Sequence, residues 1–443
     1  MNVYLYELEN LTDILDDLIF EEEPPFFNQT TALEFLESAL LLIDIYVNDN
    51  PTIITEPDFF ETIQEEIEEL FYLQFEDQIN NENVADEFDE LLEEAIHIYV
   101  TSFYSERSLQ LSEINESLKT DEDINEIEEQ INYLRSKPQP QQRTEDWYKF
   151  RHNLITASNA YKAFESQATQ NQLIYEKCQP LKTNDDSKSV NINTTFHWGQ
   201  KYEPVSVLMY EHLYNTTVED FGCIQHDTYS FIGASPDGIN IDQKNENLYG
   251  RMLEIKNIVN REITGIPKKE YWIQTQLQME VCKLDECDFL ETKFVEYENA
   301  NDFYNDGTSL KTAKDEFKGI ILYFGTNKGN PFYIYKPIEM TDYEEISKWE
   351  EEMMDLYQSS THNMIWIKTI YWKLEKLSCV LILRNQKWFQ DNIGQIGKIW
   401  DTIEKERISG YEHRAPNRKT KKPTIDLNNQ PDIKCFLIKK SLD

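Results

Sequence analysis

The distribution of charge along the 443 residues is the feature that most constrains how this chain can fold. Residues 1–140 hold 37 Asp and Glu against four Lys and Arg, a net charge of −33. The other 303 residues carry 45 acids and 38 bases, a net charge of −7. Because phosphates repel an acidic surface, only this second part is balanced enough to contain a local basic groove.

Residues 1–137 are predicted to form an acidic, all-α N-terminal domain. Apolar residues recur every three or four positions in TALEFLESALLLIDIYV, and again in TDEDINEIEEQINYL behind a Thr120 or Asp121 N-cap, as in amphipathic helices. The simplest interpretation of the charge is a solvated surface on a small bundle. Two alternatives are a docking surface for a basic partner and a DNA-mimicking cover over an active groove.

The remainder of the chain is predicted to contain an α+β, or mixed α/β, core. Segments such as RMLEIKNIV, DFLETKFVEY and GIILYFG are short and rich in β-branched and aromatic residues, which is typical of strands. Helical patterns lie on both sides of them, as in a sheet flanked by helices. After a linker rich in Pro and Gln we place the core at 138–340, an extension of helices and strands packing on it at 341–412, and a basic, flexible tail at 413–443.

The cysteines and the hydropathy pattern bear on the compartment. Six cysteines, at positions 178, 223, 282, 287, 379 and 435, are scattered without a C-x-x-C pair, which predicts reduced thiols and no zinc site. No apolar run near the N-terminus approaches the roughly 20 residues needed to cross a bilayer, and the first residues lack a secretory pattern. We therefore expect a soluble intracellular protein that does not bind membranes.

Two short stretches carry side chains suited to metal-dependent chemistry. The turn GASPDGI presents Asp237, and alternation along the strand LEIKN puts Glu254 and Lys256 on one face. The two carboxylates and the carbonyl of Ile255 suit Mg²⁺, and Lys256 could orient or deprotonate a water that attacks phosphorus. Taken alone, so short a pattern more often reflects an aspartate in a turn and a solvent-facing Glu/Lys pair than a metal site.

A longer series of motifs gives this pattern a context. WYKFRHNLITAS, HWGQKYEP, GASPDGI, LEIKN and YWIQTQLQMEV occur in this order over roughly residues 143–300. Together they resemble the YqaJ-type viral recombinase nucleases of the PD-(D/E)XK superfamily, relatives of phage lambda exonuclease. The acidic N-terminal segment is similar to versions found in large DNA viruses. The resemblance implies a restriction-endonuclease-like core, with a central mixed sheet flanked by helices, and Mg²⁺ as the cofactor, with Mn²⁺ as a substitute.

The resemblance also implies roles for individual residues in catalysis. Asp237, Glu254 and the Ile255 carbonyl match the metal ligands, Lys256 matches the catalytic lysine, and Glu203 matches an additional metal-side acid from a helix. Gln274 and Gln276 match glutamines of the helix bordering the site, and Gln278 lies one turn beyond Gln274. The structural alternatives are a surface glutamate at 203 and glutamines that only pack the helix on the sheet.

Arg151 and Ser158 match residues that hold the 5′-phosphate of a DNA end in such exonucleases. A guanidinium forks onto phosphate oxygens, and a helix beginning at a Ser158 cap would offer free N–H groups. The alternatives are a surface salt bridge and an ordinary cap. Further backbone contacts are expected from Lys244, Arg251, Arg261, Lys268 and Lys269, and from the basic stretch 414–422.

The leading expectation is a Mg²⁺-dependent DNase, a 5′→3′ exonuclease on double-stranded DNA ends that serves viral recombination or repair. The alternatives are a structure-selective endonuclease, and a non-catalytic DNA-binding or scaffold protein that works through its acidic domain. A single-strand annealing protein or a replication factor would be the protein partner. The compartment would be the host cytoplasm, a viral factory or the nucleus, and the sequence leaves oligomerisation open.

Overall fold

The structure is a computed structural model, and it describes residues 27–79, 82–102, 119–140, 144–181, 191–265 and 267–415. The expected basic tail over 413–443 lies outside these ranges from residue 416 onward. Within them, no helix combines the length and the hydrophobicity that crossing a membrane requires. Five of the six cysteines fall in the described ranges, and all five are buried as free thiols.

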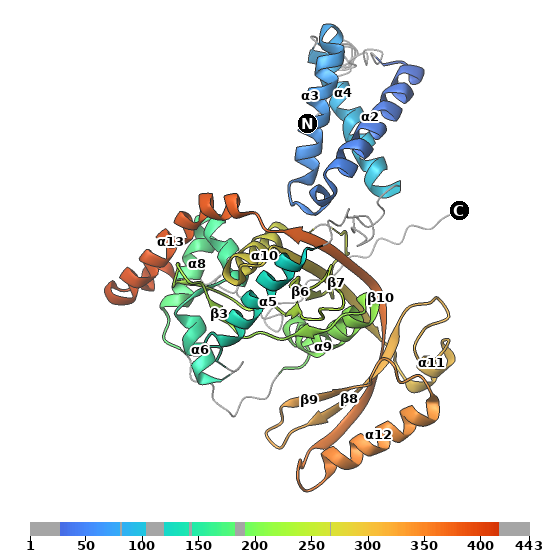
Figure 1. Cartoon of the computed structure of the whole chain (residues 1–443), viewed down its shortest axis with the longest axis vertical. Coiled ribbons are helices and arrows are strands. Elements are labelled where there is room, and N and C mark those ends of the chain that lie inside the picture. Colours follow the sequence, from blue (N-terminus) through green and yellow to red (C-terminus); the bar gives the residue numbers. More distant parts are fainter. Residues whose placement is uncertain are drawn as a thin grey trace, which may run out of the picture.

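The first described helices form a unit of their own, at the top of Figure 1. It consists of α2 (Gln29–Asp49), the 3₁₀ turn η2 (Pro51–Thr55), α3 (Phe59–Ile79) and α4 (Glu82–Ser102). Their apolar faces meet in a separate core that includes Phe35, Ile43, Ile67 and Leu92. Residues 27–102 contain 20 Asp and Glu and no Lys or Arg, so the unit concentrates negative charge around that core.

A seven-stranded mixed sheet forms the centre of the molecule. Its strand order is β2 (Val218–Glu219), β5 (Gly238–Asn240), β6 (Met252–Asn257), β7 (Glu286–Glu296), β10 (Ile365–Leu383), β8 (Lys318–Gly325) and β9 (Pro331–Tyr335). Only β6 and β7 run parallel, and the other neighbours are antiparallel. A small second sheet has the order β1 (Ile155–Thr156), β4 (Ile232–Ala234) and β3 (Ile224–Gln225).

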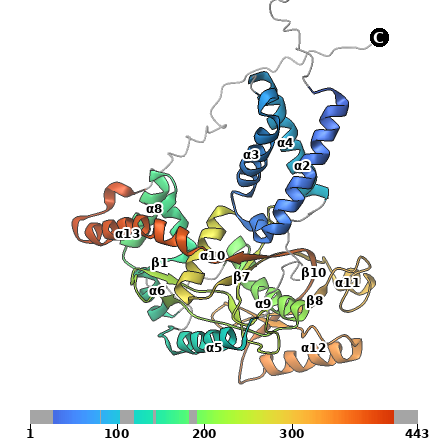
Figure 2. The same ribbon diagram turned by 45° about the horizontal axis from the view of Figure 1, so that its top comes forward.

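Two helices cover opposite faces of β6 and β7 (Figures 1 and 2). Because strand side chains alternate, Leu253 and Ile255 face α9 (Thr195–Tyr214) and pack on its Tyr210. Met252 and Phe289 face the other way, in the main core shared with α10 (Lys269–Cys282). The mixed α/β class expected from the sequence is therefore confirmed.

The remaining helices surround this centre. They are α5 (Asp121–Ser136), α6 (Glu145–His152), α7 (Ala157–Ala160), η3 (Tyr161–Phe164), α8 (Gln167–Cys178), α11 (Ala300–Asn305), α12 (Tyr343–Gln358), α13 (Gln386–Ser409) and η4 (Glu412–Arg414). Arg407 of α13 donates to the carbonyls of His152 and Lys177, where α6 and α8 end. A cation at these carboxyl ends satisfies their open carbonyls and ties the three helices together.

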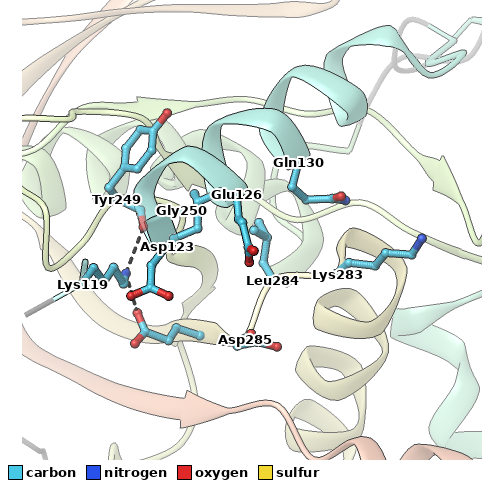
Figure 3. Close-up of a pocket in the computed structure, with 11 residues that line it drawn as sticks. Lys119, Asp123, Glu126, Gln130, Tyr249, Gly250, Lys283, Leu284 and Asp285 are labelled. Atoms are coloured by element: carbon cyan, nitrogen blue, oxygen red, sulfur yellow. Dashed lines mark hydrogen bonds and ion pairs between the residues drawn. The ribbon is translucent and has the colours of Figure 1, made fainter. Parts of the chain in front are cut away.

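Helix α5 packs on the mixed core, although it belongs to the acidic stretch 1–137. Thr120 caps it through a capping box with Asp123, and Ile131 and Leu134 are buried in the main core. Gly250 lies directly beside it (Figure 3), with a φ of +81°, and a Cβ there would stand 2.4 Å from Ile127. Only glycine allows this approach, so the NLYGR loop fits this docked position of α5.

The stretch after residue 340, expected as an extension, supplies a central strand. Strand β10 pairs with β7 over residues 372–383 and with β8 over residues 365–373. Its long curved path joins the two halves of the sheet in Figure 1. The outer half, β8 and β9, is covered on one face by α12 through Ile346 and Trp349.

The helical unit meets the core near the end of β10. Leu381 of β10 is buried in the core of the helical unit. Beside this junction, the pKa of Glu56 is raised from 4.5 to about 7, chiefly by burial and also by the charge of Asp58, while its interaction with the Trp272 side chain of α10 opposes the rise. Because the folded pKa exceeds the unfolded value, the folded chain binds the extra proton between pH 4.5 and about 7, and stability falls as pH rises through this window.

We therefore expect Glu56→Gln to stabilise the chain above this window only. Its Tm should exceed that of the parent by about 2 °C at pH 8 and match it at about pH 3, where the carboxyl group is protonated in both the folded and the unfolded chain. Thermal unfolding followed by circular dichroism at the two pH values measures this. Glu61→Gln, at an exposed position of α3, is the matched control. Equal melting temperatures for the parent and Glu56→Gln at pH 8 would contradict the assignment.

Candidate active site

A pocket of about 560 Å³ opens at the carboxyl end of β6. Its lining brings together eight of the residues singled out in the sequence: Arg151, Ser158, Glu203, Asp237, Glu254, Ile255, Lys256 and Gln274. They come from α6, α7, α9, the start of β5, β6 and α10. None of the described residues 27–79 and 82–102 lines this pocket, so the acidic helical unit does not cover it.

The hairpin between β5 and β6 places Asp237 beside Glu254. Gly238 pairs with Leu253, and the N–H of Asp237 donates to the carbonyl of Leu253 at 3.1 Å. The ladder ends there, because Pro236 has no N–H to continue it. The N–H of Ile255 donates instead to the Asp237 carboxylate at 2.7 Å, which fixes that carboxylate against β6.

Glu254 is held at both carboxylate oxygens. Its Oε1 accepts from the amide of Gln274 at 2.7 Å and from the ammonium of Lys256, and its Oε2 accepts from the amide of Gln278 at 2.7 Å. The Lys256 ammonium also donates to Gln274 Oε1 at 3.2 Å. Two glutamines one helical turn apart on α10 thus clamp the acid of β6, and the acid and the lysine lie on one face of the strand, as the alternation predicts.

The pocket holds more negative than positive charge. Burial raises the pKa of Asp237 well above its ordinary value, and the charges of Glu254 and Glu203 raise it further. Burial would lower the pKa of Lys256, but Glu254 and Asp237 raise it overall, so the lysine is an ammonium at neutral pH. One ammonium therefore faces three carboxylates.

This imbalance is the kind that a bound cation relieves. The available ligands are carboxylate and carbonyl oxygens, which suit a hard ion such as Mg²⁺. The C=O and N–H of one strand residue point to the same side, so the Ile255 carbonyl faces Asp237, as its N–H does. Among the described residues, no three His, Cys, Asp or Glu side chains converge closely enough to hold a metal alone. The donor set fits an ion that takes few protein ligands and keeps several waters.

Glu203 reaches the pocket from α9. The helix continues through Pro204, whose ring removes the N–H that would otherwise bond the carbonyl of Gln200, another lining residue. The position of α9 is fixed by Asn257, whose side chain bonds Ser206 at 2.7 Å and the carbonyl of Gly199 at 3.2 Å. The asparagine that follows the lysine of LEIKN thus positions the helix that carries Glu203.

Arg151 and Ser158 line the same pocket. Thr144 caps α6, as a Thr directly before Glu145 and Asp146 predicts, and Arg151 stacks on Trp147 one turn earlier, with the guanidinium 4.6 Å from the ring centre. Burial lowers the pKa of Arg151, and no described Asp or Glu side chain forms an ion pair with it. A half-buried guanidinium without a carboxylate is available for an anionic ligand.

The expectation that Ser158 caps a helix is wrong. The N-cap is Thr156, and Ser158 is the second residue of the four-residue α7. Its exposed hydroxyl lies 3.3 Å from the Thr156 hydroxyl and lines the pocket. The side chain therefore faces the pocket as a hydroxyl rather than as a cap.

Other residues expected at the site lie elsewhere. The Gln276 amide bonds the Leu383 carbonyl at 2.8 Å and the Asn385 N–H at 2.6 Å, because it points to the β10–α13 junction. Arg251 is only 4% exposed and pairs with Glu286 and Asp288, so a DNA contact would require breaking buried ion pairs.

The other basic residues that flank the site differ from one another in exposure. Arg261 pairs with Glu291, and its guanidinium lies over the ring of Tyr271. Lys244, Lys268 and Lys269 are exposed.

Tyr271 and Phe196 are aromatic residues of the pocket that were not singled out from the sequence. The ring of Tyr271 lies 4.9 Å from the Lys256 ammonium and forms the wall beside it. Its position three residues before Gln274 on α10 was the available signal. Phe196 lines the pocket with 75% of its surface exposed, and nothing in the local pattern marks it.

Comparisons with known proteins agree with these motifs. Residues 146–285 match the family model described as the YqaJ-like viral recombinase domain. An uncharacterized protein of Acanthamoeba polyphaga mimivirus is 30% identical over 305 residues, which cover 62% of this chain and 54% of the mimivirus protein. The chain thus spans about half the length of that relative.

Solved structures give weaker similarities. The alkaline exonuclease of Laribacter hongkongensis is 18% identical, with a TM-score of 0.35, over 60% of this chain and 94% of that one. A phage-related exonuclease of Haemophilus somnus 129PT is 12% identical, with a TM-score of 0.30, over 59% and 96% of the two chains. All the pocket residues, from Trp147 to Gln274, lie inside the region matched by the family model. Residues 146–285 of this chain are therefore similar to the YqaJ-like viral recombinase domain, the family that the sequence motifs resemble.

Proposed function

We propose that the chain is a Mg²⁺-dependent deoxyribonuclease that hydrolyses phosphodiester bonds at the ends of double-stranded DNA during viral recombination or repair. One observation carries the proposal: the Lys256 ammonium, bonded to Glu254 and Gln274, shares a pocket with Asp237 and with Arg151, which pairs with no carboxylate of the described residues. The YqaJ-like domain and the names of the similar exonucleases support the same reaction class.

Asp237, Glu254 and the Ile255 carbonyl would hold the cation, with Glu203 beside them. When bound, Mg²⁺ would activate water and stabilise the charge that develops on the phosphate; Mn²⁺ could substitute for it. Lys256 would orient the attacking water and share in neutralising the phosphate. Gln274 would hold the side chains of Lys256 and Glu254 in fixed positions relative to each other, since its side-chain amide bonds both. Gln278 would keep the second oxygen of Glu254 in place.

Arg151 and Ser158 would bind the terminal 5′-phosphate in the same pocket. A guanidinium already stacked on Trp147 loses little freedom when it binds an anion, and the exposed hydroxyl adds a donor. Holding the 5′ end at a fixed distance from the metal-side acids gives 5′→3′ exonuclease action. Gln276 is left out of this scheme, because its amide is already bonded at the β10–α13 junction.

Two other functions remain as rivals. A structure-selective endonuclease would use the same metal-side residues without needing a free end. A non-catalytic scaffold would work through the acidic helical unit, docking a basic region of an annealing protein or replication factor. The guanidinium of Arg151 lies in the pocket and pairs with no described carboxylate, so it is available for a terminal phosphate. This favours the exonuclease over both rival functions.

Lys256→Ala is expected to lower DNA hydrolysis at least about 100-fold, because it removes the ammonium bonded to Glu254 in the pocket. The measurement is a time course of nucleotide release from linear duplex DNA in Mg²⁺. Lys244→Ala, at an exposed lysine outside the pocket, should keep the parental rate. Equal rates for the parent and Lys256→Ala would exclude the mechanism.

Arg151→Gln is expected to remove the preference for 5′-phosphorylated ends. The parent should degrade 5′-phosphorylated linear DNA about tenfold faster than 5′-hydroxyl DNA, since a charge-assisted contact contributes about 1.5–3 kcal/mol, and the variant should treat both ends alike. Time courses with either strand labelled also give the polarity. Nicking of a covalently closed circle at the rate found for linear DNA would instead favour the endonuclease.

Asp237→Asn is expected to stabilise the cation-free chain and to remove the stabilisation that Mg²⁺ provides. The raised pKa of Asp237 means that the folded, cation-free chain loses stability as pH rises, so the variant should melt about 2 °C higher than the parent at pH 8 in EDTA. Adding Mg²⁺ should raise the Tm of the parent and leave that of the variant unchanged. Calorimetric scans with and without Mg²⁺ test this; an identical Mg²⁺ response in both proteins would argue against a site at Asp237.

A further inference from the structure

A second hollow, of about 420 Å³, adjoins the catalytic pocket. Thr195, at the start of α9, lines both of them. Phe196, the next residue, lines the catalytic pocket and is 75% exposed, so the first turn of α9 is the ridge between the two hollows. Both lie at the same end of the sheet, since Lys256 is near the carboxyl end of β6 and Glu296, in the second hollow, ends β7.

Aromatic rings form the walls of the second hollow. Tyr323 of β8 pairs with Tyr333 of β9, their ring centres are 5.1 Å apart, and both line the hollow together with Trp198 of α9. Alternation along the strands sends Phe324 and Phe332 to the opposite face, where α12 covers them. The side chains of Tyr323 and Tyr333, by contrast, are only half-buried.

The charge of the second hollow is positive. Lys201 forms an ion pair with Glu296, and Lys368 lies 3.7 Å from the same carboxylate, with 56% of its side chain exposed. Two lysines therefore share one acid, the only Asp or Glu among the described lining residues. The ridge adds the amino end of the 20-residue α9, where Thr194 caps only the N–H of His197. The open N–H groups of that first turn favour a phosphate.

We propose that this second hollow binds nucleobases of a single DNA strand as it passes the catalytic pocket. Stacking on aromatic rings tolerates any base, because every base has a π-face, and lysines follow the backbone. A strand running from the catalytic pocket into the hollow would lay a phosphate across the amino end of α9. This inference rests on the proposed function, which supplies the DNA. It adds a site in which the β8–β9–β10 half of the sheet, outside the matched residues 146–285, meets the start of α9.

The experiment compares oligonucleotides with and without bases, on the full chain. Fluorescence anisotropy in EDTA measures binding of a labelled oligothymidine and of an abasic oligonucleotide of equal length, so no hydrolysis intervenes. Tyr323→Leu, which keeps an apolar side chain, is expected to weaken oligothymidine binding about tenfold, as loss of one stacked base would. Its affinity for the abasic strand should stay within about twofold of the parent. Tyr343→Leu, at a 46% exposed tyrosine of α12, is the control and should change neither.

Lys368→Gln tests the charge independently of stacking. It should weaken both oligonucleotides alike and lower the slope of log Kd against log salt by about 0.7, the value for one phosphate contact on a single strand. Lys348→Gln, at a 77% exposed lysine of α12, should leave the slope unchanged.

The outcomes separate this inference from the proposed function. If the parent hydrolyses DNA but Tyr323→Leu binds oligothymidine like the parent, the nucleobase site is wrong and the nuclease stands. If the parent does not hydrolyse DNA but Tyr323→Leu still loses only base-dependent affinity, the binding site stands and the nuclease fails. If sedimentation shows that Tyr323→Leu instead dissociates an oligomer, the face is a contact between copies and the inference is overturned.

Discussion

The carboxylate of Glu254, buried between β6 and α10, is the interaction on which the pocket depends. Its two oxygens accept bonds from Lys256, Gln274 and Gln278, so a single acid fixes the lysine and the pocket-facing side of α10 together. Asp237 is tied to the same strand through the Ile255 N–H. A buried charge is tolerated only when such partners satisfy it, which explains why so many polar groups converge on one strand.

The sheet connects this pocket with parts of the chain far away in the sequence. Strand β10 pairs with β7, the neighbour of β6, and then continues to hold β8. Strands β8 and β9 therefore lie near the end of the sheet at which the pocket opens, and their tyrosines pack against α9. Residues 146–285 supply all the residues that line the first pocket, whereas the later residues complete the sheet and form the second hollow together with α9.

The acidic helical unit is attached at a different point. It packs on Leu381, which is in register with Asp288 of β7 and through it with Leu253 of β6. That attachment lies before Lys256 along β6, and no described residue of the unit lines either hollow. The charge that dominates the chain is therefore kept off the pocket walls, where it would repel phosphates. The separation also leaves the acidic surface accessible to a basic partner.

The sequence alone determined what depends on neighbouring residues. The spacing in LEIKN fixed Glu254 and Lys256 on one face, Thr120 and Thr144 marked helix starts, and the ordered motifs identified the domain, because alternation, capping and turns act within a few residues. The tertiary structure decided what depends on distant partners. It turned Gln276 toward Asn385 and left Gln278 on Glu254, and it buried Arg251 against Asp288. It also inserted β10 into the middle of the sheet. Helix periodicity cannot distinguish two glutamines that face different neighbours, and no local pattern reports which strand lies beside another, since those contacts join residues about a hundred positions apart.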